Sequence, residues 1–260
     1  MDMSRYYYLS GMPRSGSTLL GSLLAQHTDV YVSSTSPLNR IMHGLYQTLQ
    51  DNAPRGIWDI DAVNSRIFKY MFEGWYEPIK QKYIFDKSRG WGFNIQAVKA
   101  FIQENPKVLI TYRDIPSIIT SFIVLIEQDP KNHVDIELYK RNKPINTETR
   151  AEYIWECFKD YGYLSTLTAM QEFQDDIHIV HYDSLVSNPA QTMKDVWNFL
   201  EIEAPEHTFT EVQTYLEVPD EKWGIENLHV IRPNIEKISK NPMEVLGQEL
   251  YEKYSEYNLI

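Results

Sequence analysis

The sequence is poor in cysteine and in long apolar runs, and both shortages exclude classes of protein. Cys157 is the single cysteine among 260 residues, so the chain can form no internal disulfide and has no cysteine partner for a thiolate metal cluster. No run of about 18 uncharged apolar residues is present to span a membrane. The N-terminus also lacks the basic and then apolar segments of an export signal. The sequence therefore predicts a soluble, cytoplasmic protein with no membrane span.

Positive charge is also scarce. The 25 Lys and Arg residues against 36 Asp and Glu residues give a formal net charge of -11. The electrostatic field of a chain with this net charge repels polyanions before contact. This excludes broad binding to nucleic acid or to an anionic membrane surface. We therefore expect no nucleic-acid partner, and any site for an anion must be a local basic pocket.

The chain has the length and the apolar content for one sizeable core. With 260 residues, 43% of them hydrophobic, it is expected to form a single domain over residues 1–260. Short apolar runs alternate with helical patterns, and the runs lie at Tyr6 to Leu9, Val30 to Val32, Tyr83 to Phe85, Val108 to Tyr112 and Ile177 to Val180. This alternation predicts an α/β fold, a three-layer sandwich in which helices cover both faces of a central parallel sheet.

Two Asn-Pro pairs near the C-terminus mark helix starts, because asparagine caps a helix and proline fits its first position. They are Asn188-Pro189 and Asn241-Pro242. The apolar spacing predicts that these helices bury Met193, Trp197 and Leu200 in the first, and Met243, Leu246, Leu250 and Tyr254 in the second.

The stretch from Gln128 to Thr149 is polar and contains two prolines. It predicts a long connection over the surface. A lid over an acceptor pocket and a solvated loop both stay open as its role.

A glycine-rich turn links the first apolar run to a leucine-striped helix. In "SGMPRSGSTLLGSLL", Gly11 is followed after four residues by Gly16, Ser17 and Thr18, which is the spacing of a phosphate-binding loop. Such a turn leaves backbone N–H groups converging at the positive end of a helix dipole, which suits a phosphate. Ser17 replaces the loop lysine that reaches the outer phosphates of a triphosphate, and Arg14 places a cation earlier instead.

The residues around this turn are more specific than the glycine spacing, which any serine- and glycine-rich turn before a helix would match. The segment resembles the sulfotransferase family that uses 3′-phosphoadenosine 5′-phosphosulfate (PAPS), in which a strand leads into Pro-[Arg/Lys]-Ser-Gly-[Ser/Thr]-Thr-Leu. The matching residues are Pro13, Arg14, Ser15, Gly16, Ser17, Thr18 and Leu19. The following "LLAQHTDVYV" resembles the family's Leu-x-x-His-Pro-x-Val, with Thr28 in place of proline. The resemblance implies a P-loop nucleotide-binding fold in which the first six of these residues bind the donor.

A second segment, "KVLITYRDIPSIITSF", predicts a strand that ends at Arg113 and a helix that contains Ser121. Asp114 is a candidate N-cap, with Pro116 near the helix start. At a rise of about 1.5 Å per residue the two backbones stay within about 12 Å, so the arginine and the serine hydroxyl can meet one anion. A surface ion pair and a serine bonded to its own helix are the alternative. The resemblance implies that both bind the donor's 3′-phosphate, although the proline of the family's Arg-Asp-Pro is displaced to Pro116.

Two later segments resemble the family in the same order. "HYDSLVSNP" resembles Tyr-Glu-x-Leu-x-x-x-Pro, with Asp183 for the glutamate, which implies that Tyr182 lies near the adenine or the 3′-phosphate. A core tyrosine at a strand end is the alternative. "VIRPNIEKISK" resembles the basic segment that closes over the donor in some members, which makes Arg232 a candidate phosphate ligand.

The resemblance implies sulfuryl transfer, in which negative charge grows on the departing phosphate of 3′-phosphoadenosine 5′-phosphate (PAP). Cations beside that leaving group matter most. Arg14 and the backbone N–H groups of residues 15–18 are candidates, and Lys87 in "FDKSRGW" resembles the lysine that several members place at the bridging oxygen. An exposed loop lysine is the alternative. The scheme requires no metal, and the seven scattered histidines suggest no metal site.

At the positions where family members carry the base that takes the acceptor's proton, this chain has other residues. Members with a glutamate base carry it just after the second strand, where this chain reads "VSSTS". Members with a histidine base carry it two residues after the lysine, where this chain has Arg89. His43, in the helix after the second strand, is a candidate base. A merely solvated histidine is the alternative, and an acidic acceptor or a water could replace the base.

We therefore expect a PAPS-dependent sulfotransferase that acts on a hydroxyl or amine of a small molecule, lipid, carbohydrate or peptide. Two other classes stay open. A P-loop kinase-like phosphotransferase is disfavoured by the missing loop lysine, and a donor-binding protein without turnover is suggested by the missing base. The acceptor and the oligomeric state are left open by the sequence.

Overall fold

Five parallel strands form the central sheet. The computed structural model describes residues 5–52, 58–214, 220, 224, 225, 228–231, 234–236 and 240–260. The strands are β1 (Tyr6–Gly11), β2 (Val30–Val32), β3 (Tyr83–Lys87), β4 (Val108–Tyr112) and β5 (Ile177–His181). They lie in the order β2-β3-β1-β4-β5, and each neighbouring pair is parallel. All five predicted strands are present, and β1, β3 and β5 continue one or two residues beyond the predicted ends.

The strand order places a crevice at the C-terminal end of β1. This strand lies between β3 and β4, so that Leu9 is opposite both Lys87 and Leu109. The chain moves to β2 and β3 on one side of β1 and to β4 and β5 on the other. In parallel sheets, ligands bind at such a reversal, beyond the carboxyl ends of the strands.

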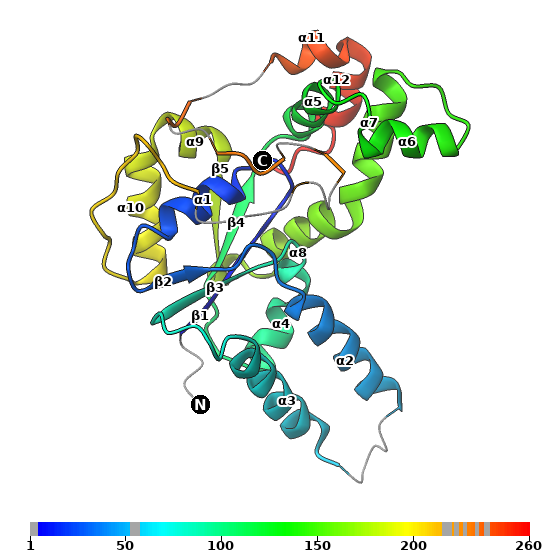
Figure 1. The fold of residues 1–260 in the computed structure, drawn as a ribbon. Helices are drawn as coiled ribbons and strands as arrows, with labels where there is room; N and C mark the ends of the chain where they lie inside the picture. Colours follow the sequence, from blue (N-terminus) through cyan, green and yellow to red (C-terminus); the bar gives the residue numbers. More distant parts are fainter. Residues whose placement is uncertain are drawn as a thin grey trace.

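One face of the sheet is covered by α1 (Ser17–Leu24), α9 (Tyr182–Ser187) and α10 (Pro189–Leu200), which lie together in Figure 1. The leucine stripe of α1 packs on this face as predicted, with Leu20, Leu23 and Leu24 fully buried and Leu19 only partly buried. The predicted start of α10 is confirmed, but the side chain of Asn188 makes no capping hydrogen bond. The predicted apolar residues of α10 are all buried.

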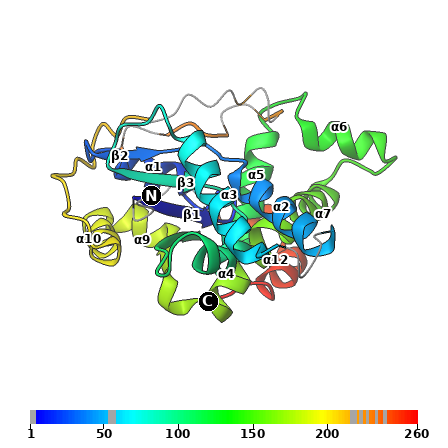
Figure 2. The same ribbon diagram turned by 90° about the horizontal axis from the view of Figure 1, so that it is seen from below.

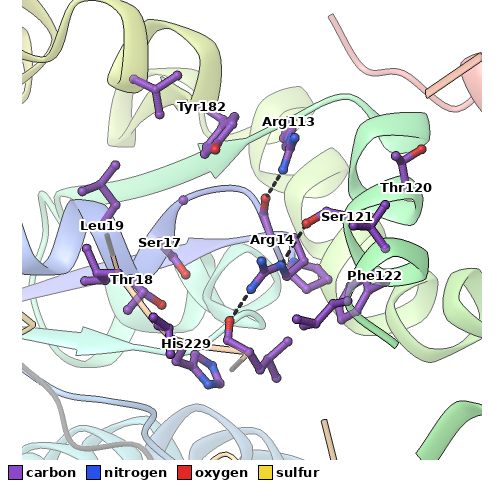
Figure 3. Close-up of a pocket in the computed structure, with 18 of the residues that line it drawn as sticks. Arg14, Ser17, Thr18, Leu19, Arg113, Thr120, Ser121, Phe122, Tyr182 and His229 are labelled. Carbon is purple, nitrogen blue, oxygen red and sulfur yellow. Dashed lines mark hydrogen bonds between the residues drawn. The ribbon is translucent and has the colours of Figure 1, made fainter. Parts of the chain in front are cut away.

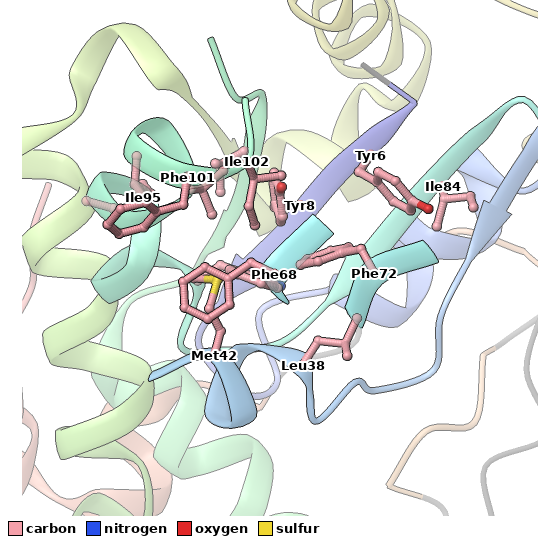
Figure 4. Close-up of a cluster of buried hydrophobic side chains, with 14 of the residues drawn as sticks. Tyr6, Tyr8, Leu38, Met42, Phe68, Phe72, Ile84, Ile95, Phe101 and Ile102 are labelled. Carbon is pink, nitrogen blue, oxygen red and sulfur yellow. The ribbon is translucent and has the colours of Figure 1, made fainter. Parts of the chain in front are cut away.

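The opposite face is covered by α2 (Leu38–Asn52), α3 (Ile60–Trp75), α4 (Trp91–Phe101) and α8 (Leu164–Glu172). Figure 4 shows Phe68 and Phe72 of α3 among Tyr6, Tyr8 and Ile84 of the sheet, all in one buried cluster. Helices on both faces of a parallel sheet confirm the predicted three-layer α/β sandwich.

A third apolar cluster lies beyond the carboxyl end of β4. It is built from α5 (Ile115–Ile126), α6 (His133–Lys140), α7 (Thr147–Phe158), α11 (Pro242–Leu246) and α12 (Gln248–Ser255). A π-helix (Lys159–Tyr163) continues α7 into α8, and a 3₁₀ turn (Gln174–Asp176) precedes β5. Both ribbon views place α6 on the opposite side of the molecule from α10 (Figures 1 and 2).

Two expectations about helices are wrong. The segment from Gln128 to Thr149 is not a continuous loop, because α6 lies within it, capped by the side chain of Asn132. The helix predicted after Asn241 is broken at Gly247, whose φ of +77° ends α11 before α12 begins. As a result Met243 is 47% exposed rather than buried, whereas Leu246 and Tyr254 are buried as expected. Within the described residues, no helix is long and apolar enough to cross a membrane.

Candidate active site

The turn between β1 and α1 uses backbone conformations that favour glycine. Gly11 has a φ of +126° and Gly16 a φ of +91°. A Cβ at Gly11 would lie 2.3 Å from the carbonyl oxygen of Thr111 on β4, so no other residue fits there without moving the strand. The glycine spacing seen in the sequence is therefore a requirement of a turn that passes close to β4.

The first turn of α1 has no side-chain cap. Gly16 occupies the N-cap position and supplies no side-chain hydrogen bond. The first N–H groups of a helix have no partner within the helix, and they carry the positive end of its dipole. Ser17 and Thr18, at this end, line a cavity. The end of α1 is thus suited to bind an anion in that cavity.

Ser15 holds the turn rather than lining the cavity. Its side chain is fully buried, and its hydroxyl hydrogen-bonds to the carbonyl oxygen of Met12 and to Thr111 Oγ1, the latter at 2.7 Å. The hydroxyl therefore ties the turn to β4. Within the predicted motif, Ser15 contributes to the site through the backbone conformation that it fixes.

Arg14 reaches across the cavity to α5. Its Nε donates a hydrogen bond to Ser121 Oγ at 3.1 Å, and its Nη1 donates to the carbonyl oxygen of Leu228 (Figure 3). The sequence suggests that Ser121 shares an anion with Arg113, whereas the structure pairs its hydroxyl with Arg14. The guanidinium of Arg14 is thereby held in place at the centre of the cavity wall.

Arg113 follows β4 and is packed between the turn and α9. It is 7% exposed; its Nη1 donates to the carbonyl oxygen of Arg14 at 3.1 Å, and its guanidinium carbon lies 4.2 Å from the ring centroid of Tyr182. Burial lowers the pKa of Arg113, although arginine stays charged at any physiological pH. Asp114 caps α5 as predicted, since its side chain accepts the N–H of Ser117 at 2.9 Å.

These elements meet around one cavity of about 650 Å³, a volume that suits a small-molecule ligand. Of the residues predicted from the sequence to bind the donor, those that line it are Pro13, Arg14, Gly16, Ser17, Thr18, Arg113, Ser121 and Tyr182. Figure 3 shows Arg14 at the centre, with Ser17, Thr18 and His229 on one side and Ser121 on the other.

Lys87 ends β3 and is held by the segment after β2. Its backbone N–H donates to Ser33 Oγ at 2.8 Å, and its carbonyl oxygen accepts the N–H of Ser36 at 2.8 Å. Desolvation by the surrounding protein, together with the charge of Arg89, lowers the pKa of Lys87 to about 7. An anion placed beside Lys87 would restore its charge.

His229 forms a close pair with Asp220. The His229 Nδ1 lies 2.6 Å from Asp220 Oδ1, and the His229 backbone N–H donates to Asp220 Oδ2 at 3.0 Å. Burial lowers the pKa of His229, the hydrogen bond that His229 makes to Asp220 and the charge of Asp220 oppose this, and the charges of Lys87 and Arg14 lower it. The ring lines the cavity, so that a histidine largely neutral at pH 7 lies next to the two cations predicted for the leaving group.

A model of the sulfotransferase family matches residues 8–206. The chain belongs to the sulfotransferase family. This membership supports sulfotransferase activity, and with it the role of a transferase enzyme. The matched range contains every residue discussed above except those of the later segment around His229.

Solved structures show that the sulfotransferase shares its fold with proteins of low sequence identity. The sulfotransferase domain of the Synechococcus PCC 7002 olefin synthase is 18% identical, with a TM-score of 0.51 over 92% of this chain and 85% of that one. Mouse sulfotransferase SULT7A1, solved in complex with PAP, is 13% identical, with a TM-score of 0.56 over 98% and 83% of the chains. No curated relative matches the chain.

Besides Ser15, two predicted residues do not line the cavity, and a third lies outside the described residues. Lys87 is not part of the lining, although Arg89 and His229, with which its charge interacts, are. His43 is exposed on α2, apart from the cavity lining. Arg232 lies outside the described residues. In the described part of the chain, no cluster of three or more His, Cys, Asp or Glu side chains is arranged to hold a metal ion.

His229 and Asp220 are the residues that sequence reasoning missed. They are nine positions apart in a segment without helical or strand periodicity, so no pattern links them. The position of His229 was the one signal that could have revealed it. This residue immediately precedes the "VIRPN" segment, which resembles the family's donor-closing segment.

Proposed function

We propose that the sulfotransferase transfers a sulfuryl group from PAPS to a hydroxyl or amine of an acceptor. One observation carries this proposal: the uncapped start of α1 and the side chains of Arg14, Arg113, Ser121 and Tyr182 come from separate segments to line one cavity. Their arrangement suits a ligand with two anionic ends. The mouse sulfotransferase of the same fold was solved with PAP, which supports the same choice of nucleotide here.

The residues divide between the two ends of this nucleotide. The backbone N–H groups at the start of α1, with Arg14, suit the 5′ phosphosulfate. Arg113 suits the 3′-phosphate, with the Ser121 hydroxyl nearby, and Tyr182, stacked on Arg113, offers an aromatic face for the adenine. No lysine lies in the loop to reach the outer phosphates of a triphosphate, which disfavours ATP.

When bound, PAPS supplies the sulfuryl group: a bond forms from the acceptor oxygen to sulfur as the bond from sulfur to the 5′-phosphate oxygen breaks, and PAP is the product. Arg14 and Lys87 stabilise the negative charge that grows on that phosphate oxygen. Ser121 holds the guanidinium of Arg14, and the serines after β2 hold the backbone that carries Lys87. Little reorganisation is then needed during the reaction.

His229 accepts the proton that the acceptor loses. Asp220 holds the Nδ1 side of the ring, which orients the imidazole and stabilises the imidazolium that forms. Burial and the neighbouring cations keep the histidine unprotonated before the reaction, as a general base requires. This role replaces the glutamate and histidine positions of the family, which this chain does not match.

Donor binding tests the proposal directly. A ligand at a hundred times its dissociation constant stabilises the folded protein by about 2.7 kcal/mol. We expect PAP to raise the melting temperature of the wild-type protein, whereas ATP with magnesium at the same concentration leaves it nearly unchanged. Stabilisation by ATP and not by PAP would reject the sulfotransferase function and favour a kinase-like one.

Arg113→Ala is expected to weaken PAP binding about tenfold to a hundredfold, because a charge-assisted contact to the 3′-phosphate is lost. The measurement is titration calorimetry with PAP and, in parallel, with adenosine 5′-phosphosulfate, which lacks the 3′-phosphate. Only PAP should lose affinity. Equal losses for both ligands would show that Arg113 acts by supporting the turn through the Arg14 carbonyl, and would refute its assignment to the 3′-phosphate.

A further inference from the structure

Next to Lys87 the cavity is lined by a cation that the donor does not require. Arg89 lines the cavity two residues after Lys87. Beside it, the guanidinium carbon of Arg40 on α2 lies 4.7 Å from the ring centroid of Tyr161, whose hydroxyl hydrogen-bonds to Asn39. The turn that carries Arg89 packs tightly here, since a Cβ on Gly90 would lie 2.5 Å from the Tyr161 hydroxyl oxygen. The positions of Arg89 and Arg40 are therefore set by packing of α2 and the π-helix against this turn.

The largest effect of a neighbouring charge on Arg89 comes from another cation, Arg40. Arg89 is exposed along the cavity, and desolvation by the protein atoms near it and then the charge of Arg40 lower its pKa. Cys157, whose own pKa is raised by burial, and Tyr161 also act on Arg89. The carboxylate of Glu156, next in sequence to Cys157, is paired with Arg141 at 3.1 Å.

Positively charged side chains thus follow one another from Arg14, in the turn before α1, to Arg40 on α2. The charges of Arg14 and Lys87 act on His229, the charge of Arg89 acts on Lys87, and the charge of Arg40 acts on Arg89. In a chain of net charge -11, these cations form a local positive region, and an anion bound there reduces the repulsion among them. Arg14 and Lys87 face the anions of the donor. Arg89 and Arg40 remain for another anion.

Arg89 occupies the position at which some family members carry their acceptor-facing histidine. Arginine cannot act as a base there, because it does not lose its proton in proteins. Its planar guanidinium instead matches carboxylate and phosphate oxygens in pairs. The residue type therefore suits recognition of an acceptor and not proton transfer.

We propose that Arg89, assisted by Arg40, binds an anionic group of the acceptor, so that the acceptor is a hydroxyl compound that carries a carboxylate or a phosphate monoester. This inference rests on the proposed function. Lys87 and His229 lie at the reacting hydroxyl, and the anionic group lies on the side of Arg89. Neutral phenols, sterols and sugars are then poor acceptors.

In the test, the protein is incubated with radiolabelled PAPS and a mixture of matched hydroxy compounds. For each carbon skeleton the mixture holds the carboxylic acid, its methyl ester and the corresponding phosphate monoester, and the labelled products identify which anion is preferred. We expect the anionic compounds to be sulfated at least tenfold more than the esters. Arg89→Gln should reduce this preference about tenfold to a hundredfold, toward equality, and Arg66→Gln, the same change at an exposed site on α3, should preserve it.

Binding of the same compounds to the PAP-loaded protein, measured by saturation-transfer NMR, gives a second result that needs no turnover. Preferential binding of the anionic compounds that Arg89→Gln removes supports the inference. Esters that bind and react as well as the acids, or a preference that survives Arg89→Gln, would overturn it. Failure of the wild-type protein to bind PAP would instead reject the proposed function, so the two failures are distinguishable.

Discussion

His229→Gln is expected to lower kcat for sulfuryl transfer by about 10²- to 10⁴-fold, the contribution typical of a positioned general base. Glutamine keeps the shape and a hydrogen-bonding end but cannot take a proton at neutral pH. The measurement is transfer of labelled sulfate from saturating PAPS, with the dissociation constant of PAP determined in parallel. PAP should still bind, because the proposed donor contacts come from other residues.

The control is His43→Gln, which changes the histidine that the sequence singles out as a base. It is exposed on α2, and its replacement is expected to leave kcat within about twofold, as at most exposed positions. Asp220→Asn should lower kcat less than His229→Gln and move the acidic limb of the pH profile, since it changes the hydrogen bond to Nδ1. An inactive His43→Gln beside an active His229→Gln would reverse the assignment.

Lys87→Met is expected to lower kcat by about 10²- to 10³-fold, as for loss of one preorganised group that stabilises charge in the transition state. Methionine keeps the length and the apolar stem of lysine and removes the charge. The rate is measured at saturating PAPS, so that weaker donor binding does not contribute. Lys82→Met is the matched control, because Lys82 is an exposed lysine at the opposite end of the same strand segment. Equal rates for wild type and Lys87→Met would exclude Lys87 from the leaving group.

The lowered pKa of Lys87 adds a pH dependence to the same residue. In the free protein this pKa is about 7, and a phosphate bound beside the ammonium raises it. Between the two values, binding takes up a proton. The affinity for PAP is then constant below pH 7 and falls above it, by at most about tenfold per pH unit.

Calorimetry between pH 7 and 9, in buffers of different ionisation enthalpy, measures both the affinity and the proton uptake. This range avoids the second ionisation of a phosphate near pH 6. Lys87→Met should remove the uptake and flatten the profile. An affinity for PAP that is independent of pH in the wild-type protein would contradict the assignment.

The sequence predicts the sheet and the donor turn because both depend on local patterns. Runs of alternating or continuous apolar residues define the strands, and the five predicted runs match β1 to β5. The positions of Gly11 and Gly16 are dictated by positive φ angles and by the approach to Thr111, so the spacing itself carries the geometry. Asp114 caps α5 for an equally local reason.

The rest of the site depends on contacts between distant segments, which no local pattern encodes. The Ser121 hydroxyl accepts a hydrogen bond from Arg14, which lies 107 positions earlier. His229 and Asp220 come together only in the folded chain. The polar segment after α5 contains α6, because Asn132 caps it and Val134 and Leu138 bury its inner face. Composition alone did not reveal that short helix.

The residues at the cavity come from two different parts of the fold. Both backbone polar groups of Lys87 are tied to the serines that follow β2, and Arg89 and Arg40 belong to the same pair of connections, after β3 and after β2. Apart from Lys87, the proposed donor contacts come from the turn between β1 and α1 and from β4, α5 and α9, toward the other half of the sheet. If the proposed roles hold, substitutions at Arg89 and Arg40 would change the choice of acceptor and leave these donor contacts in place.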